Sequence, residues 1–209
     1  VSLPQALVSP MIARFLATYP LITVNLASTN RRVDVIEEGV DVAFRVRFPP
    51  LENSNLVMKN LGRSEQLLVA SPSFLDEHGR PDDPRQATAL PTMDLKRVMP
   101  RHAWELFSEK GDMISVPFQP RYVSDDMAAL RDAALNGIGI VQLPEYMVRT
   151  DISAGELEVV LPEWRPKAGI VHIVFASRRG LAPAVRHFID FMEKEFSLAS
   201  RGAPVESAL

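Results

Sequence analysis

The sequence predicts an α/β protein whose sheets are mostly parallel. Segments with helically spaced apolar residues alternate along the chain with short apolar segments rich in β-branched residues. These short segments are nearly continuous in their apolar character, which is typical of strands buried on both faces of a parallel sheet. In residues 124–144, SDDMAALRDAALNGIGIVQLP, the pattern predicts a helix, a glycine turn and a buried strand in immediate succession.

Length and composition limit the class of protein. The chain has 209 residues, 46% of them hydrophobic, which is enough for one large domain or two lobes of about 100 residues. The formal net charge of -3 makes it a poor candidate for binding nucleic acid by itself. No apolar run approaches the roughly 20 residues of a membrane span, and the first residues lack the features of a signal peptide. The absence of cysteine excludes disulfide bonds and thiolate metal sites.

The first quarter of the chain is expected to hold two helices and two strands. Apolar residues recur with helical spacing over residues 7–19, where Pro10 marks either a restart or a kink of the helix. The β-branched residues of 21–26 predict a strand. Residues 28–36 follow as a capped short helix, and 42–46 as an apolar strand interrupted by a single arginine.

The middle of the chain alternates apolar runs with turn-forming residues. Residues 56–61 and 66–70 are predicted strands, and the Ser-Pro-Ser of 71–73 is expected to cap a short helix. Residues 104–107 and 113–116 flank a glycine-containing turn and therefore predict a β-hairpin.

The remaining elements follow the helix that residues 124–126 are expected to cap. Gly137 is predicted to end that helix, because glycine adopts the left-handed conformation at little cost. Strands are expected at residues 157–161 and 170–176. A final amphipathic helix is expected over 183–196, with the tail frayed beyond it.

The order of these motifs resembles the effector-binding domain of LysR-type transcriptional regulators. The resemblance covers about residues 1–196, and each motif taken alone is weak. The motifs occur in the order FLATYPLITVNL, RRVDVIEEGVDVAFRV, LVASPSFLDEHGRPDDP, DDMAALRDAALNGIGIVQLP, GELEVVLPEW and RRGLAPAVRHFIDFM.

The resemblance implies a type 2 periplasmic-binding-protein-like fold, in which two Rossmann-like lobes are joined by two crossover segments. Residues 1–70 and 171–197 would form lobe I, residues 71–170 lobe II, and residues 198–209 a flexible tail. An N-terminal winged helix-turn-helix domain is expected in the family and is absent from this chain.

The resemblance also implies a function. A small-molecule effector would bind between the lobes, and the domain would form a homodimer or homotetramer in the cytoplasm. DNA would be bound only through the missing N-terminal domain, and neither a cofactor nor a membrane partner is expected. A periplasmic solute-binding protein of a transporter remains the alternative, because it has a similar fold.

Three candidate effector contacts are expected in lobe I. Ser2 and Thr29 match positions at helix N-termini, where hydroxyl and N–H groups bind polar or anionic groups, although both could serve only as caps. Arg45 is a charge within an apolar strand, which is costly unless it reaches solvent, a carboxylate or a ligand. A structural salt bridge and a ligand contact are both compatible with this position.

Lobe II is expected to contribute four contacts. Met93 and Asp94 would lie in the loop after a strand, while Ser124 and Asp125 open the helix that follows. Whether Asp125 or Asp126 points inward stays open. An inward Asp125 would favour a polar or cationic effector over an anionic one.

The sequence gives little support to catalysis, so we do not expect an enzyme. There is no GxSxG motif, and the glycines of Gly137-Ile138-Gly139 follow a helix and precede a strand, which is the reverse of a phosphate-binding loop. Paired acids such as Asp82-Asp83 fit loops and caps better than a general acid and base. No metal-ligand spacing links the four histidines, His78, His102, His172 and His187.

Overall fold

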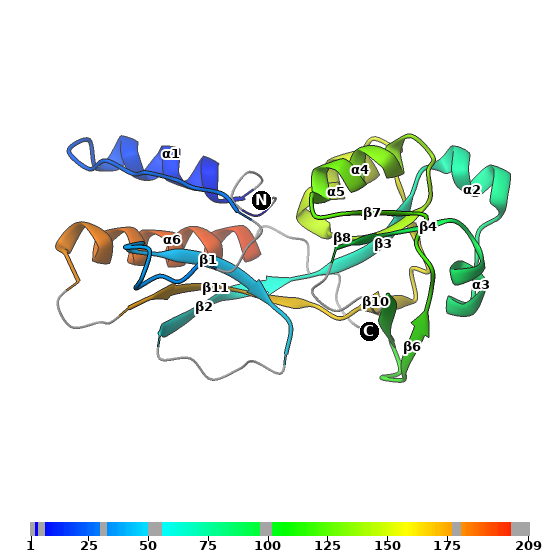
Figure 1. Cartoon of the computed structure of the whole chain (residues 1–209). Coiled ribbons are helices and arrows are strands. Elements are labelled where there is room, and N and C mark those ends of the chain that lie inside the picture. The colour runs from blue at the N-terminus through cyan, green and yellow to red at the C-terminus, as the bar shows by residue number, and fades with distance from the viewer. Residues whose placement is uncertain are drawn as a thin grey trace. The chain divides into compact units, whose positions relative to one another are not determined.

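The structure is a computed structural model in which the chain divides into two units (Figure 1). Unit 1 is Ser64–Ala168, and unit 2 combines Leu3–Arg63 with Gly169–Leu209. The chain therefore passes between the units twice, after residue 63 and after residue 168. The residues that the structure describes are 3, 7–29, 33–49, 56–96, 102–176 and 181–201.

Unit 2 is built from elements at both ends of the chain, and unit 1 from the continuous stretch between them. The elements of unit 2 are α1 (Ser9–Thr18), β1 (Ala43–Arg47), β2 (Val57–Ser64), β11 (Gly169–Phe175) and α6 (Pro183–Arg201). Those of unit 1 are β3 (Gln66–Ala70), α2 (Pro72–His78), α3 (Pro84–Ala89), β4 (Thr92–Leu95), β5 (Ala103–Ser108), β6 (Met113–Pro117), β7 (Tyr122–Ser124), α4 (Met127–Leu135), β8 (Ile140–Pro144), α5 (Glu145–Ser153), β9 (Glu158–Val160) and β10 (Trp164–Pro166).

Unit 1 contains a five-stranded sheet in the order β7-β4-β8-β3-β9. Strand β4 is parallel to β7 and β8, whereas β3 is antiparallel to both of its neighbours, β8 and β9. Four of the five strands thus share one direction, and β3 alone runs the opposite way.

The expectation of mostly parallel sheets was wrong for the two smaller sheets. Strands β10, β5 and β6 form an antiparallel sheet in unit 1, and β1 is antiparallel to β11 in unit 2. Between β5 and β6 the chain turns within residues 109–112, and a connection this short can join only antiparallel strands. The predicted hairpin is confirmed, with Gly111 in the left-handed region at φ 87°.

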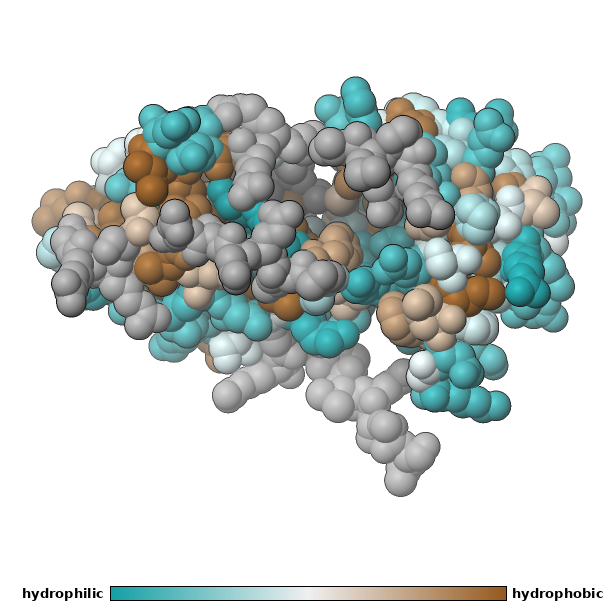
Figure 2. Space-filling view, turned by 60° about the horizontal axis from the view of Figure 1, so that its bottom comes forward, coloured by the Kyte–Doolittle hydropathy of each residue, from teal (hydrophilic) through white to brown (hydrophobic). Residues whose placement is uncertain are grey.

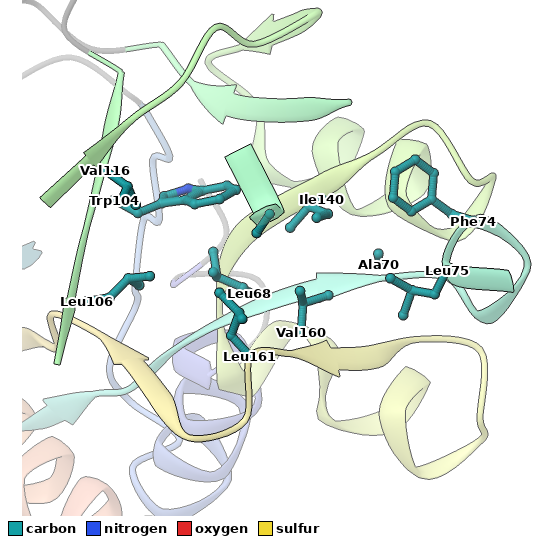
Figure 3. Packing of buried hydrophobic residues seen from close by; sticks show 11 residues of the cluster. Leu68, Ala70, Phe74, Leu75, Trp104, Leu106, Val116, Ile140, Val160 and Leu161 are labelled. Atoms are coloured by element: carbon teal, nitrogen blue, oxygen red, sulfur yellow. The ribbon is translucent and has the colours of Figure 1, made fainter. Parts of the chain in front are cut away.

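Strand β3 lies at the centre of the unit 1 core because its side chains alternate between two apolar clusters. Leu67 and Val69 face the cluster that includes Leu130 of α4. Leu68 and Ala70 face the opposite cluster, which Figure 3 shows with Trp104 of β5. Burial on both faces explains why residues 67–70 of this strand are all apolar.

The helix, turn and strand predicted around Gly137 are confirmed. The Asp126 carboxylate accepts a hydrogen bond from the N–H of Ala128 at 2.9 Å and so caps α4. At the other end, the Gly137 N–H bonds to the carbonyl of Ala134 while Gly137 adopts φ 72°. Residues 136–139 then lead from helix α4 into β8. Local capping therefore sets where the helix begins and ends, and with it where the strand can begin.

Gly139 lets this turn pass close to a neighbouring segment. A Cβ atom at this position would lie 2.5 Å from the carbonyl oxygen of Pro91, which accepts the N–H of Ile140. We expect Gly139→Ala to lower the free energy of unfolding by about 2 kcal/mol, as overpacking against backbone does. Urea denaturation followed by circular dichroism measures this loss.

Gly155 provides the control for that substitution. It has φ 73° and nothing within 4 Å of an added Cβ, so Gly155→Ala tests conformational strain alone. We expect it to cost about 1 kcal/mol. If Gly139→Ala and Gly155→Ala lower the free energy of unfolding equally, the close approach of Gly139 to Pro91 does not account for the loss.

In unit 2, helix α6 covers one face of the sheet β1-β11-β2, and α1 packs on α6 (Figure 1). Phe44 of β1 meets Phe188 and Phe196 of α6 with ring centroids 6.2 and 6.3 Å apart. Phe15 of α1 meets Phe188 and Phe191 at 5.1 and 5.3 Å. The three layers are therefore joined by one aromatic cluster.

The strand predicted over residues 21–26 was wrong. These residues have no regular secondary structure, and the side chain of Leu21 is 98% exposed. A strand requires a hydrogen-bonded neighbour, and no strand in the described residues pairs with this segment. Its β-branched composition alone does not supply that neighbour.

Two other local predictions concern the starts of helices. The carboxylate of Asp34 accepts the N–H groups of Ile36 and Glu37, and the end of the predicted short helix is instead part of a turn over residues 35–39. Residues 30–32 of that prediction lie outside the described residues.

Helix α1 is bounded by Ser9, so Pro10 lies in its first turn, where its missing N–H costs little. Residues 7 and 8 are already helical, and Val8 holds the capping position without a side-chain hydrogen bond. Ser9 is therefore not the cap, and the restart and the kink both stay open.

Exposed apolar residues occur in both units. Figure 2 shows hydrophobic residues interspersed with hydrophilic ones on the face that it presents. Across the described ranges, no helix combines the length and apolar character of a membrane span. The large apolar residues that are exposed are Leu21, Leu26, Ile36, Phe48, Met58, Met113, Tyr122, Val123 and Leu198.

Candidate functional site

In unit 1, the carboxyl ends of β4 and β7 bring together three of the predicted site residues. These strands are parallel, with Leu95 opposite Ser124 in the register, and the N–H of Lys96 bonds to the Ser124 carbonyl at 2.8 Å. Asp94 and Asp125 are the neighbours of Leu95 and Ser124 in sequence. The carboxyl edge of a parallel sheet is where open α/β folds bind ligands, so this edge is a candidate site.

Asp94 lies within β4, so the prediction that it belongs to a loop was wrong. Its side chain is buried, with 3% of the residue exposed. One carboxylate oxygen accepts the N–H of Leu95 at 2.9 Å, and the other accepts from Nδ1 of His102 at 2.7 Å. These bonds satisfy a carboxylate that would otherwise be costly to bury.

His102 is a member of this site that sequence reasoning missed. It precedes β5 and is partly exposed, with its ring 6.1 Å from that of Phe118. Because Nδ1 bonds to Asp94, the ring is oriented and Nε2 is the nitrogen left for another partner. No local spacing in the sequence signals this pair.

Met93 was also predicted in the loop and also lies in β4. It is fully buried and packs in the cluster that includes Leu130 and Val141. The strand continues to Leu95, so Met93 is not in a loop. Its side chain lies on the face of the strand that packs in this cluster. In this structure Met93 has no exposed surface that a ligand could contact.

The start of α4 separates the roles of its two acids. Asp126 is the capping residue, and its own N–H bonds to the hydroxyl oxygen of Ser124 at 3.0 Å. Asp125, between them, is exposed and is not the cap. The hydroxyl of Ser124 keeps its hydrogen for donation to a ligand or water.

In unit 2, Arg45 bonds to a backbone carbonyl. Its Nη2 donates to the oxygen of Val33 at 2.6 Å, and the side chain is half-buried. Across the strands, Arg45 lies opposite His172 of β11. This contact holds the guanidinium beside the backbone of Val33. The two expected roles of Arg45, a structural salt bridge and a ligand contact, both stay predictions.

His172 is a buried histidine held in its neutral form. Burial lowers its pKa, and the positive charges of Arg47 and Arg45 lower it further. Its Nδ1 donates to the carbonyl of Ile170 at 3.2 Å. The interpretation of this residue as an ordinary core histidine fits these contacts.

The lowered pKa of His172 predicts a pH dependence of stability. The folded state binds this proton less readily than the unfolded state, so stability is complete above the ordinary histidine pKa of about 6.5 and falls as pH drops below it. We expect His172→Gln to reduce the loss of unfolding free energy between about pH 7.5 and pH 5.5. His187→Gln, at an exposed position of α6, is the control and should leave the loss unchanged.

Of the other two candidates expected in lobe I, the structure describes only Thr29. Thr29 is exposed and ends a stretch without regular structure. Ser2 lies outside the described residues. Within the described ranges, no group of three or more His, Cys, Asp or Glu side chains could hold a metal ion.

The family model of the LysR substrate binding domain matches residues 1–197. An HTH-type transcriptional regulator of Xanthomonas campestris is 32% identical over 189 residues, which are 88% of this chain and 54% of that protein. The chain thus spans about half the length of this relative. This relative is a transcriptional regulator rather than a transport receptor, which favours the first of the two functions expected from the sequence.

Solved structures agree with the family match. The structure of CrgA, a LysR-type transcriptional regulator from Neisseria meningitidis, has a TM-score of 0.80 and 27% identity, covering 93% of this chain and 65% of that one. The Vibrio cholerae virulence activator AphB, a member of the LTTR protein family, has a TM-score of 0.80 and 26% identity, covering 92% of this chain and 64% of that one. The predicted fold class is confirmed.

Proposed function

Because this chain belongs to the family of LysR substrate binding domains, we propose that it is the effector-sensing and oligomerisation part of a DNA-binding transcriptional regulator. The match over residues 1–197 is the observation that carries this proposal. DNA would be contacted through a winged helix-turn-helix domain outside the given sequence, and the regulator would act in the cytoplasm as a homodimer or homotetramer.

We place the effector at the carboxyl edge of β4 and β7 in unit 1. Thr29 and Arg45 are candidate polar contacts that belong to unit 2. Units 1 and 2 would correspond to lobes II and I. The unit 1 edge offers the hydroxyl of Ser124, the carboxylate of Asp125 and the Nε2 of His102. These groups suit a small polar effector that carries both donors and acceptors. Met93 is left out because it is buried.

The proposed mechanism is a shift between conformations rather than a chemical reaction. An effector that binds one arrangement of the lobes better than another shifts the population toward it. The shift cannot exceed the difference in its affinities, and a tenfold change needs about 1.4 kcal/mol. This mechanism needs no catalytic residue, which agrees with the sequence.

The first test is a thermal-shift screen of small metabolites against the full-length gene product. A ligand at 100 times its Kd should stabilise the protein by about 2.7 kcal/mol. Asp125→Asn should reduce the shift that the best ligand produces, whereas Asp82→Asn, at an exposed position between α2 and α3, should not.

Footprinting on the gene's own promoter is the second test. The full-length protein should protect a promoter site, and the ligand found in the screen should change the pattern of protection. Failure to bind DNA would contradict the regulator proposal. A ligand whose effect survives Asp125→Asn unchanged would contradict only the placement of the site.

A further inference from the structure

Unit 2 contains a cavity of about 390 Å³ between the sheet and the beginning of α6. Its apolar lining includes Phe175 and Ile189, both of which are buried. Charged side chains from β2 and α6 complete the wall. The lining residues are Lys59, Phe175, Leu181, Arg186, Ile189 and Asp190.

The two cations of the lining differ in their partners. Nζ of Lys59 lies 2.5 Å from a carboxylate oxygen of Glu193 and 3.6 Å from one of Asp190, so its charge is largely offset. Arg186 is exposed, and its backbone N–H bonds to the carbonyl of Ala182. Within the described part of the chain, no carboxylate is paired with its guanidinium group. Arg186 therefore supplies the charge that is available to a ligand.

We propose that this cavity binds a small amphipathic carboxylate. The apolar body of the ligand would lie against Phe175, Ile189 and Leu181, and its carboxylate would accept two hydrogen bonds from the planar guanidinium of Arg186. The cavity volume falls within the roughly 300–1,000 Å³ of small-molecule sites. A neutral analogue would keep the apolar contacts and lose the paired charge.

This site is separate from the one proposed for the effector. Side chains alternate between the two faces of a strand. Phe44 of β1 packs on α6, so the next residue, Arg45, lies on the opposite face of the sheet. The cavity is on the α6 face, and its existence does not depend on the regulator proposal.

Hexanoate is a suitable probe, with hexanamide as its neutral analogue. We expect hexanoate to bind with a Kd on the order of 1 mM, as a ligand of this size can. Titration monitored by two-dimensional NMR of the labelled chain should shift the amide signals of Lys59, Phe175 and residues 186–190. Hexanamide should bind more weakly at the same place.

Two exposed substitutions should change hexanoate affinity in opposite directions. Arg186→Gln should weaken binding about fivefold, as the loss of an exposed ion pair does. Asp190→Asn should strengthen binding about twofold, because it removes a negative charge beside the ligand carboxylate. Arg149→Gln, at an exposed arginine of unit 1, is the matched control and should leave binding unchanged.

Four results would overturn this inference. The first three are amide shifts that do not saturate with hexanoate, shifts of residues away from the cavity, and equal Kd values for hexanoate and hexanamide. The fourth is an unchanged Kd of hexanoate in both Arg186→Gln and Asp190→Asn.

Discussion

Arg131→Met is expected to lower the free energy of unfolding by about 3 kcal/mol, because it leaves a buried carboxylate without its partner. Arg131 of α4 forms a two-pronged ion pair with Asp151 of α5, in which Nε lies 2.6 Å from Oδ2 and Nη2 contacts Oδ1. The Asp151 side chain is 3% exposed. Hydrogen bonding to Asp151 raises the pKa of Arg131, which indicates that the folded state favours the charged pair.

Urea denaturation can separate the ion pair from general effects of removing an arginine. Arg149→Met is the control, because this arginine is 53% exposed and pairs with Glu145 within α5. We expect that control to cost less than about 1 kcal/mol. The double variant Arg131→Met, Asp151→Leu should recover much of the lost stability, since it removes both charges. If Arg131→Met and Arg149→Met lose equal unfolding free energy, the buried ion pair contributes no more to stability than an exposed one.

Trp104→Ala should destabilise unit 1 by about 4 kcal/mol, because it opens a cavity in the core. Trp104 is fully buried, with its ring 4.4 Å from that of Phe118. Figure 3 shows it among the apolar side chains of β3, β6 and β8 that form this cluster. No residue in this packing can replace the volume of the indole.

Trp104→Phe should cost far less than Trp104→Ala. The indole Nε1–H is buried and has no hydrogen-bond partner in the described structure, so its removal relieves a desolvation cost. Both substitutions remove one of the two tryptophans in the sequence, so urea denaturation followed by circular dichroism compares the variants without depending on indole emission. Equal losses of unfolding free energy in the alanine and phenylalanine variants would contradict the assignment of the loss to the cavity.

Elements whose ends are set by local side chains could be predicted from the sequence. Asp126 caps α4 and Gly137 closes it, and both signals lie within a few residues of the bonds they make. The β5–β6 hairpin depends on the turn at Gly111 in the same way. Strand β3 was predicted with its observed bounds because it is apolar on both faces.

Features that depend on distant partners could not be predicted. The segment of residues 21–26 has the composition of a strand, yet a strand also needs a neighbour, which composition does not specify. The direction of β3 depends on pairing with β8 and β9, far along the chain. At the candidate site, the partner of Asp94 is His102, and only the fold brings these two side chains together.

The order in which the chain is synthesised has a consequence for how the two units form. The described part of unit 1 is one continuous stretch, so all of its strands leave the ribosome before β11 does. In the unit 2 sheet, β11 lies between β1 and β2, which are made much earlier. Nascent β1 and β2 must therefore wait, without their shared neighbour, until the whole of Ser64–Ala168 and β11 have been translated. Unit 1 can mature first on the ribosome, while unit 2 completes its sheet only after β11 has emerged.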